Sequence, residues 1–168
     1  MSEYVGVAGS GPSAAFFDLD RTLISGSSAY TLALQARRAG MIQNFEFVRD
    51  AAGAAAFKLF GADDDTTDAV KARVLKAVSG MRQSDLQALN VEILPRLLAR
   101  LRPEARRLLD THRQAGRDTY IVSAAPQEIV EPLAHSLGMT SGIGTRSKVF
   151  DGRYTGELDG PFLSLIHI

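Results

Sequence analysis

The chain has 168 residues, of which 45% are hydrophobic and 23% are charged, and its formal net charge is zero. This composition is typical of a globular protein with one core and at most a small second lobe. A neutral chain has no overall field that would attract nucleic acid or a membrane surface. The lack of cysteine excludes a disulfide scaffold, a thiolate nucleophile and a cysteine-based zinc site, and it agrees with a reducing, cytoplasmic location.

Residues 1–13 are rich in glycine and serine, and we interpret them as a flexible leader. They lack the basic segment and apolar core of a signal peptide. Residues 5–14 imitate the glycine pattern of a dinucleotide-binding loop, but that motif needs a strand before it and a helix after it. Here a strand follows the glycines, which argues against dinucleotide binding. No apolar run is long enough to span a bilayer, so we expect no stable membrane insertion.

Four apolar residues at 14–17 lead directly into Asp18 and Asp20. A short apolar run predicts a buried parallel strand, whose carboxyl end reaches the crevice where open α/β sheets bind ligands. The two carboxylates would repel each other, and a cation bound between them and a phosphate would remove that repulsion. Thr22 could donate to a phosphate oxygen. The alternative is a strand ending in an acidic turn, with Asp20 or Thr22 capping the next helix.

The next segments are predicted to be helical. Ser27 or Ser28 is expected to cap a helix that runs to Ala39 and stops at Gly40. An apolar stripe predicts a second helix over residues 45–60, and a third is expected over residues 68–78. The acidic run at 63–68 lacks the glycine and distal glutamate of a calcium loop.

Ser84 is expected to cap a helix over residues 85–101, which Pro95 kinks or splits. Arg102 and Pro103 then predict a new helix, which ends at Gly116. Seven arginines lie in this part of the chain, at positions 96, 100, 102, 106, 107, 113 and 117. They are mixed with acids and lack interleaved aromatic residues, so a solvated helix face is favoured over a nucleic-acid patch.

A second apolar strand is predicted over residues 119–123, and it ends at Ser123. Pro126 starts a helix that Gly138 stops. Residues 142–150 and 154–158 predict two strands joined by a turn at 151–153. Ser123 alone is compatible with a helix N-cap, and that interpretation also fits an anion site at a helix N-terminus.

The motif Asp18-Leu19-Asp20-Arg21-Thr22 resembles the first motif of the haloacid dehalogenase-like phosphatases, and residues 120–126, with Ser123, resemble their second. The helical insert between them resembles the phosphoserine-phosphatase-like branch. The resemblance implies a Rossmann-like α/β core over residues 14–24 and 103–162. It also implies an inserted helical cap over residues 25–102.

The resemblance further implies a mechanism. Asp18 would be the nucleophile that forms an aspartyl-phosphate, and Asp20 the general acid and base. Thr22, Ser123 and the backbone N–H of Ala124 would bind the phosphoryl oxygens. Mg²⁺ would be held by the Asp18 carboxylate and the Asp20 backbone carbonyl, and the partner would be a small phosphorylated metabolite.

Two departures from the family pattern concern the site. In the family, a lysine and a pair of acids should follow the predicted hairpin. The last lysine of this chain is Lys148, which lies within the hairpin, and no lysine or acid pair follows it. We therefore expect a fragment whose last core strands are missing, with an atypical tail at 163–168. The second departure is Ser27, which occupies the place of the glutamate that binds the substrate ammonium in phosphoserine phosphatases.

The resemblance therefore implies Mg²⁺-dependent phosphomonoester hydrolysis as the function of the parent enzyme, with impaired activity in this chain. Two alternatives stay open. One is a phosphotransferase of the same fold. The other is a binding or regulatory domain without turnover, which the absent lysine and acids favour.

Overall fold

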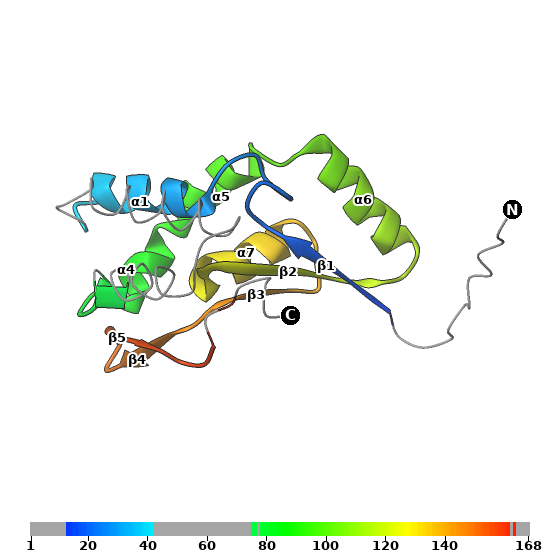
Figure 1. Cartoon of the computed structure of the whole chain (residues 1–168). Helices are drawn as coiled ribbons and strands as arrows, with labels where there is room; N and C mark the ends of the chain where they lie inside the picture. Colours follow the sequence, from blue (N-terminus) through cyan, green and yellow to red (C-terminus); the bar gives the residue numbers. More distant parts are fainter. Residues whose placement is uncertain (1–12, 42–74, 77, 162, 164–168) are drawn as a thin grey trace, which may run out of the picture.

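The structure is a computed structural model that describes residues 13–41, 75–76, 78–161 and 163. It is an α/β fold with a central parallel sheet and a group of helices at one end of it (Figure 1). The sheet and its crossover helices comprise β1 (Ala14–Asp18), α6 (Pro103–Gln114), β2 (Asp118–Pro126), α7 (Gln127–Ser136) and β3 (Ser141–Thr145). The predicted fold class is confirmed.

The three core strands are all parallel and lie in the order β1-β2-β3. Asp18 pairs with Val122, and Val122 pairs with Ile143, so the carboxyl ends of all three strands lie at one edge of the sheet. Helices α6 and α7 pack against β2, as parallel connections require. The core draws on β1, β2 and the helices, and its fully buried side chains include Leu19, Leu23, Ile93, Leu97, Leu109, Ile121, Ile129, Val130 and Leu133.

β1 is buried on one face only, which differs from the expectation of a fully buried strand. Phe17 lies in the core, where its ring meets His112 of α6 edge-on at 5.7 Å. Phe16 points to the opposite face, stacks on Tyr120 at 5.3 Å and is 65% exposed.

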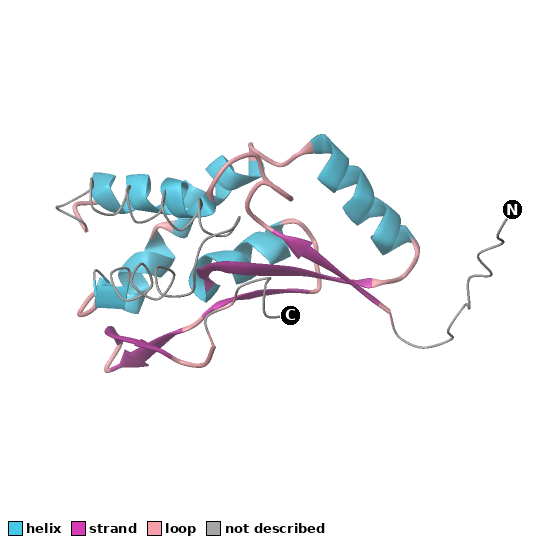
Figure 2. Cartoon of the chain, viewed as in Figure 1, coloured by secondary structure: helices cyan, strands magenta, loops and turns pink. Residues whose placement is uncertain are grey.

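The helices at the end of the sheet are α1 (Ser28–Arg38), α4 (Gln83–Ala88) and α5 (Asn90–Leu98). Figure 2 shows them as a group beside the sheet. In α1 the predicted signals are confirmed: Ser27 is the N-cap, its hydroxyl accepts from Tyr30 N, and Gly40 follows the helix with φ 71°. The predicted helix over 45–60, most of that over 68–78 and the acidic run at 63–68 lie outside the described residues.

The single helix predicted over residues 85–101 was wrong in two respects. Pro95 lies inside α5, and the chain instead breaks at Leu89, where Leu89 enters the core and the Asn90 side chain donates to the Glu128 carbonyl at 2.8 Å. Ser84 is not the N-cap, because α4 already begins at Gln83. The Gln83 N–H instead donates to the Gly152 carbonyl at 3.0 Å, so a distant turn takes over the capping.

The single strand predicted over residues 142–150 is two strands. β3 leaves the core sheet at Thr145, and β4 (Ser147–Phe150) then pairs antiparallel with β5 (Arg153–Leu158). The turn between β4 and β5 has positive φ at Asp151 and Gly152, as the sequence predicted for a tight hairpin.

This hairpin is hydrogen-bonded to residues 80 and 81, which lie just before α4. Tyr154 exchanges backbone hydrogen bonds with residues 80 and 81, Gly80 N to Tyr154 O at 2.8 Å and Tyr154 N to Met81 O at 3.0 Å. The buried Tyr154 hydroxyl donates to Glu128 Oε1 at 2.8 Å, which Gln83 also contacts. Burial and then the Glu128 carboxylate raise the Tyr154 pKa, so this hydroxyl stays a donor.

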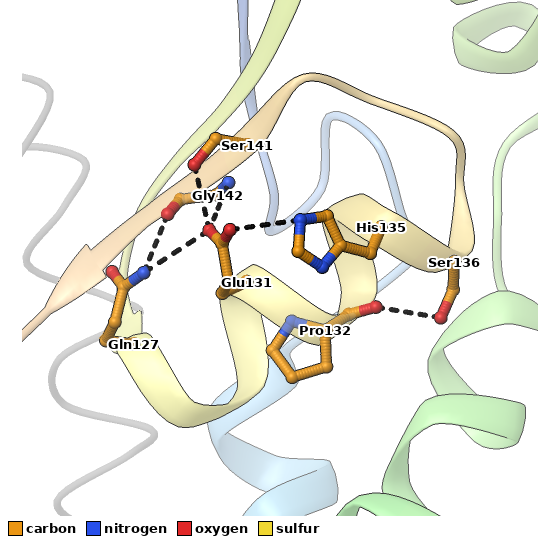
Figure 3. A network of polar contacts seen from close by, with 7 residues as sticks. All are labelled: Gln127, Glu131, Pro132, His135, Ser136, Ser141 and Gly142. Carbon is orange, nitrogen blue, oxygen red and sulfur yellow. Dashed lines mark hydrogen bonds and ion pairs between the residues drawn. The ribbon is translucent and has the colours of Figure 1, made fainter.

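Side chains of α7 satisfy the outer edge of β3 (Figure 3). Gln127 donates to the Gly142 carbonyl at 2.8 Å and accepts from Gly144 N at 2.6 Å, while Glu131 accepts from Gly142 N at 2.7 Å and from Ser141 Oγ at 2.9 Å. These groups stand where a neighbouring strand would otherwise bond. The approach is close enough that a Cβ at Gly142 would overlap the Val130 carbonyl.

We therefore expect Gly142→Ala to destabilise the protein by about 1–3 kcal/mol, because the helix or the strand must shift. The melting temperature should fall by roughly 2–4 °C for each kcal/mol. Ser141→Ala is the matched control in the same strand, since it removes one hydrogen bond without a clash. If the control costs more stability than Gly142→Ala, close packing is not the constraint at this edge.

Candidate active site

The two carboxylates lie where β1 ends and the chain turns. Asp18 is the last residue of β1, and its carbonyl accepts from Leu23 N at 3.2 Å, which closes the turn. Arg21 adopts a left-handed φ of 64°, uncommon for a side chain of this size. The turn thus holds Asp18, Asp20 and Thr22 close together at the carboxyl edge of the sheet.

Asp18 is half-buried and bound by Thr22, whose hydroxyl donates to Asp18 Oδ2 at 2.8 Å. Burial raises the pKa of the Asp18 carboxyl, while the hydrogen bonds from Thr22 and from the Leu19 backbone act in the opposite direction. The Asp18 carboxylate therefore orients the Thr22 hydroxyl, and Thr22 is exposed to solvent.

Asp20 faces the N-terminus of α1, where the Ser28 N–H donates to Asp20 Oδ1 at 2.7 Å. Burial is the main effect on the pKa of this carboxyl and raises it. Ser28 lowers it, and the neighbouring Asp18 charge raises it further. The alternative reading of Asp20 as a helix cap is thus partly right: Ser27 caps α1 locally, and Asp20 binds its first N–H from a distance.

Ser123 lies at the same edge on the neighbouring strand, one residue after the partner of Asp18. It is buried, and its hydroxyl oxygen accepts from Ala125 N at 3.1 Å, which leaves the hydroxyl hydrogen free to donate. Ser123 is not the helix N-cap that sequence alone allowed, because Pro126 holds that position before α7. The register with β3 shifts between Val122 and Pro126, so Ala124 lies in an irregular part of the strand.

The oxygen donors present suit a hard cation. The Asp18 carboxylate and the Asp20 backbone carbonyl are on the same turn, and no hydrogen bond from another described residue occupies that carbonyl. Mg²⁺ is often bound by one or two carboxylates and otherwise by waters, so this donor set fits it. Within the described ranges, no three acids or histidines gather into a larger ligand cluster.

Lys148 lies on the exposed face of β4, where its Nζ pairs with Glu157 Oε2 at 2.9 Å. The Glu157 carboxylate raises the pKa of this lysine. The hairpin therefore holds Lys148 against its own second strand, and the structure offers it no contact with Asp18 or Asp20.

Two arginines at the base of the helical group were missed by sequence reasoning. The linker that leads from β1 to α1 pairs with the linker that leads from α5 to α6. Ser25 N donates to the Arg100 carbonyl at 2.8 Å, and Arg102 N donates to the Leu23 carbonyl at 2.9 Å. The Arg102 guanidinium donates to the Arg21 carbonyl at 2.8 Å, and that of Arg100 donates to Thr31 Oγ1 at 3.1 Å. Other arginines of this run form the predicted exposed helix face, with surface ion pairs such as Arg96–Glu92.

The burial of Asp20 has a consequence for stability. Its unfolded carboxyl has a pKa near 3.9 and the folded pKa is higher, so the folded state loses stability as pH rises between the two values. We expect Asp20→Asn, which retains an oxygen for Ser28 N, to raise the melting temperature at pH 7 by roughly 2–4 °C, the shift that about 1 kcal/mol produces. Thermal melts should show this gain shrinking towards pH 4, and a gain that is constant with pH would contradict the charge argument.

Known proteins resemble this chain in both sequence and fold. A probable phosphatase of Mycobacterium tuberculosis is 34% identical over 154 residues, which cover 91% of this chain and 54% of that protein. A phosphoserine phosphatase of the same organism is 32% identical over 156 residues, covering 89% and 49%. The chain thus spans about half the length of these curated relatives.

A phosphoserine phosphatase solved as an analogue of its phospho-aspartyl intermediate has the same fold, with a TM-score of 0.60, 18% identity, and coverage of 89% of this chain and 63% of that one. Within the described residues, no helix is both long and apolar enough to cross a bilayer. The family model of haloacid dehalogenase-like hydrolases matches residues 15–165. Because that match spans nearly the whole chain, the protein belongs to the haloacid dehalogenase-like hydrolase family.

Proposed function

We propose that this protein hydrolyses phosphomonoesters of small metabolites through an aspartyl-phosphate on Asp18. The observation that supports the proposal is that two acids and a buried hydroxyl lie at one edge of the sheet. Asp18 ends β1 and Asp20 follows it, while Ser123 follows the part of β2 that pairs with β1. Family membership and the phosphatases among the curated relatives support it. A cytoplasmic location belongs to the same proposal.

In the first step, an Asp18 oxygen attacks phosphorus while the bond from phosphorus to the alcohol oxygen breaks. Asp20 gives its proton to the departing oxygen, and its raised pKa favours the protonated form that this role needs. In the second step, Asp20 takes a proton from water as the water oxygen attacks phosphorus. Inorganic phosphate leaves, and Asp18 is restored.

The hydroxyl groups around Asp18 are suited to hold the transferring phosphoryl group. Ser123 has a free hydroxyl hydrogen, and Thr22 needs only to rotate its O–H from Asp18 Oδ2 to a phosphoryl oxygen. Mg²⁺, held by the Asp18 carboxylate and the Asp20 carbonyl, would supply positive charge against the repulsion between Asp18 and the phosphate. Positioning and charge stabilisation of this kind account for most catalysis of phosphoryl transfer.

A second candidate is a binding domain without turnover. It is favoured by the pairing of Lys148 with Glu157 and by the lack, among the described residues, of an acid pair beside Asp18. Under the main proposal, a lysine and an acid pair from outside these 168 residues complete the site. The two candidates therefore differ in what the remainder of the reading frame contributes.

Asp18→Asn should lower the hydrolysis of an aryl phosphate by more than ~1,000-fold, because loss of the nucleophile removes the covalent route. Acid-quenched wild-type protein should carry labelled phosphate after incubation with substrate, and the variant should not. Asp151→Asn, at the hairpin turn, is the matched control and should retain both signals. Labelling that survives Asp18→Asn would assign the nucleophile elsewhere.

The 168-residue chain should hydrolyse the same ester at least ~100-fold more slowly than the protein translated from the complete reading frame. The reason is that one absent stabiliser of developing charge commonly costs that factor or more. Steady-state rates of both proteins, with Asp18→Asn as the background, would measure the difference. Equal rates would mean that residues within the 168 already complete the site.

A further inference from the structure

A row of buried polar side chains runs along α1 away from Asp20. Ser28, Thr31 and Gln35 follow a spacing of three and four residues, which places them on one helix face. Their exposed fractions are 3%, 5% and 3%, although this is the face that normally carries apolar residues. A polar row in this position needs a partner, because burial of an unpaired polar group is costly.

Part of this row has no partner. The Gln35 Nε2 amide is buried without a hydrogen bond, and so is the Ser28 hydroxyl, which lies close enough to Asp20 to lower its pKa but lacks hydrogen-bond geometry to it. Thr31 is the exception, since its hydroxyl donates to the Ser27 carbonyl at 3.1 Å and accepts from Arg100. Buried groups without partners in a folded protein often mark the place of a missing ligand or water.

Arg100 brings a positive charge to this row. Its guanidinium lies against the loop that joins Asp20 to α1, so closely that a Cβ at Gly26 would overlap Nη2. Among the described residues it makes one side-chain hydrogen bond, to Thr31, and no carboxylate there forms an ion pair with it. A guanidinium has five N–H donors and no acceptor, so most of its donors remain for a ligand.

The Arg100 side chain is not needed to hold the linkers together, because the backbone does so through Ser25 N to Arg100 O and Arg102 N to Leu23 O. The positive charge of Arg100 disfavours a cationic ligand. The Ser27 hydroxyl is already the cap of α1, and Asp20, the carboxylate at the start of the row, already accepts from Ser28 N at 2.7 Å. Beyond Asp20, the row offers hydrogen-bond donors and the charge of Arg100.

We propose that Arg100 and the buried row of Ser28, Thr31 and Gln35 form the leaving-group subsite of this protein. This subsite selects phosphomonoesters whose alcohol carries a second anionic group, a carboxylate or another phosphate. The inference rests on the proposed phosphatase function, since the subsite lies beside Asp20, which would protonate the leaving oxygen. An alcohol that bears an ammonium group and no anionic group, as in ethanolamine-like esters, is disfavoured by the Arg100 charge.

The test uses four esters on the same two-carbon skeleton: phosphoglycolate with a carboxylate, ethylene glycol bisphosphate with a second phosphate, 2-hydroxyethyl phosphate, and phosphoethanolamine. With the protein from the complete reading frame, kcat/KM for an anionic ester should exceed that for 2-hydroxyethyl phosphate by about 10-fold or more, and phosphoethanolamine should be the poorest. The better of the two anionic esters identifies the ligand group. A wild-type protein that prefers phosphoethanolamine, or shows no preference, overturns the proposal.

Arg100→Gln should reduce the ratio of kcat/KM between the best anionic ester and 2-hydroxyethyl phosphate by about 10- to 100-fold. Arg100→Lys, which keeps the charge but loses the planar fork, should reduce the same ratio by less. Arg96→Gln is the matched control one turn earlier on α5, and it should leave the ratio unchanged. If Arg100→Gln slows all four esters equally, Arg100 only orders the linker, and the proposal fails.

Failure of the subsite can be distinguished from failure of the proposed function. If none of the esters is hydrolysed, the phosphatase proposal falls, and calorimetric binding to the Asp18→Asn protein tests the subsite on its own. Tighter binding of phosphoglycolate or the bisphosphate than of phosphoethanolamine, lost in the Asp18→Asn, Arg100→Gln double variant, would support the subsite. Equal binding of all esters would overturn it.

Discussion

The parallel pairing of β1 with β2 is the constraint on which the rest of the structure depends. It joins residues about a hundred positions apart and sets Asp18 beside Val122, so that Ser123 follows at the same edge. Parallel strands cannot be linked by a tight turn, and the chain between them must cross over through helices. The long helical insert therefore departs from the end of β1 and returns to the start of α6, and both linkers lie close to the carboxylates.

Burial of the two carboxylates at the candidate site lowers the stability of the folded protein. Asp18 and Asp20 are drawn into a partly dehydrated turn, where burial raises the pKa of both carboxyls. The fold offsets part of this cost with the Thr22 hydroxyl on Asp18 and the first N–H of α1 on Asp20. Such an arrangement suits a site in which one acid must be charged and its neighbour protonated, because their surroundings differ.

Two of the connections between the helical group and the core lie near the candidate site. The linkers pair beside the first motif, while the β4–β5 hairpin pairs with residues just before α4 and reaches Glu128 through Tyr154. Glu128 belongs to the first turn of α7, which follows directly after the Ser123 segment. These contacts thus reach the turn after β1 and the first turn of α7, the two segments that follow the strands with candidate site residues.

The sequence by itself determined the features that depend on neighbouring residues. The apolar run before Asp18, the cap at Ser27, the glycine stops at 40, 116 and 138 and the turn at Asp151 were all predicted correctly, because local backbone preferences decide them. The sequence also carried the resemblance to the family, since each of the two motifs lies within a few residues, and the match of the family model to residues 15–165 confirms it. The resemblance implied that the acids after the first strand and Ser123 share one site, and the pairing of β1 with β2 brings these segments to the same edge of the sheet.

Only the tertiary structure decided where elements break and which distant groups share a contact. The helix splits at Leu89 instead of Pro95 because Asn90 binds Glu128, and the strand after Gly142 divides because β4 pairs with β5 and not with the core sheet. Arg100 looked like one more surface arginine, yet it lies against Gly26, 74 positions earlier in the chain. Such contacts depend on how whole helices pack against each other, and residue spacing within one helix carries no information about them.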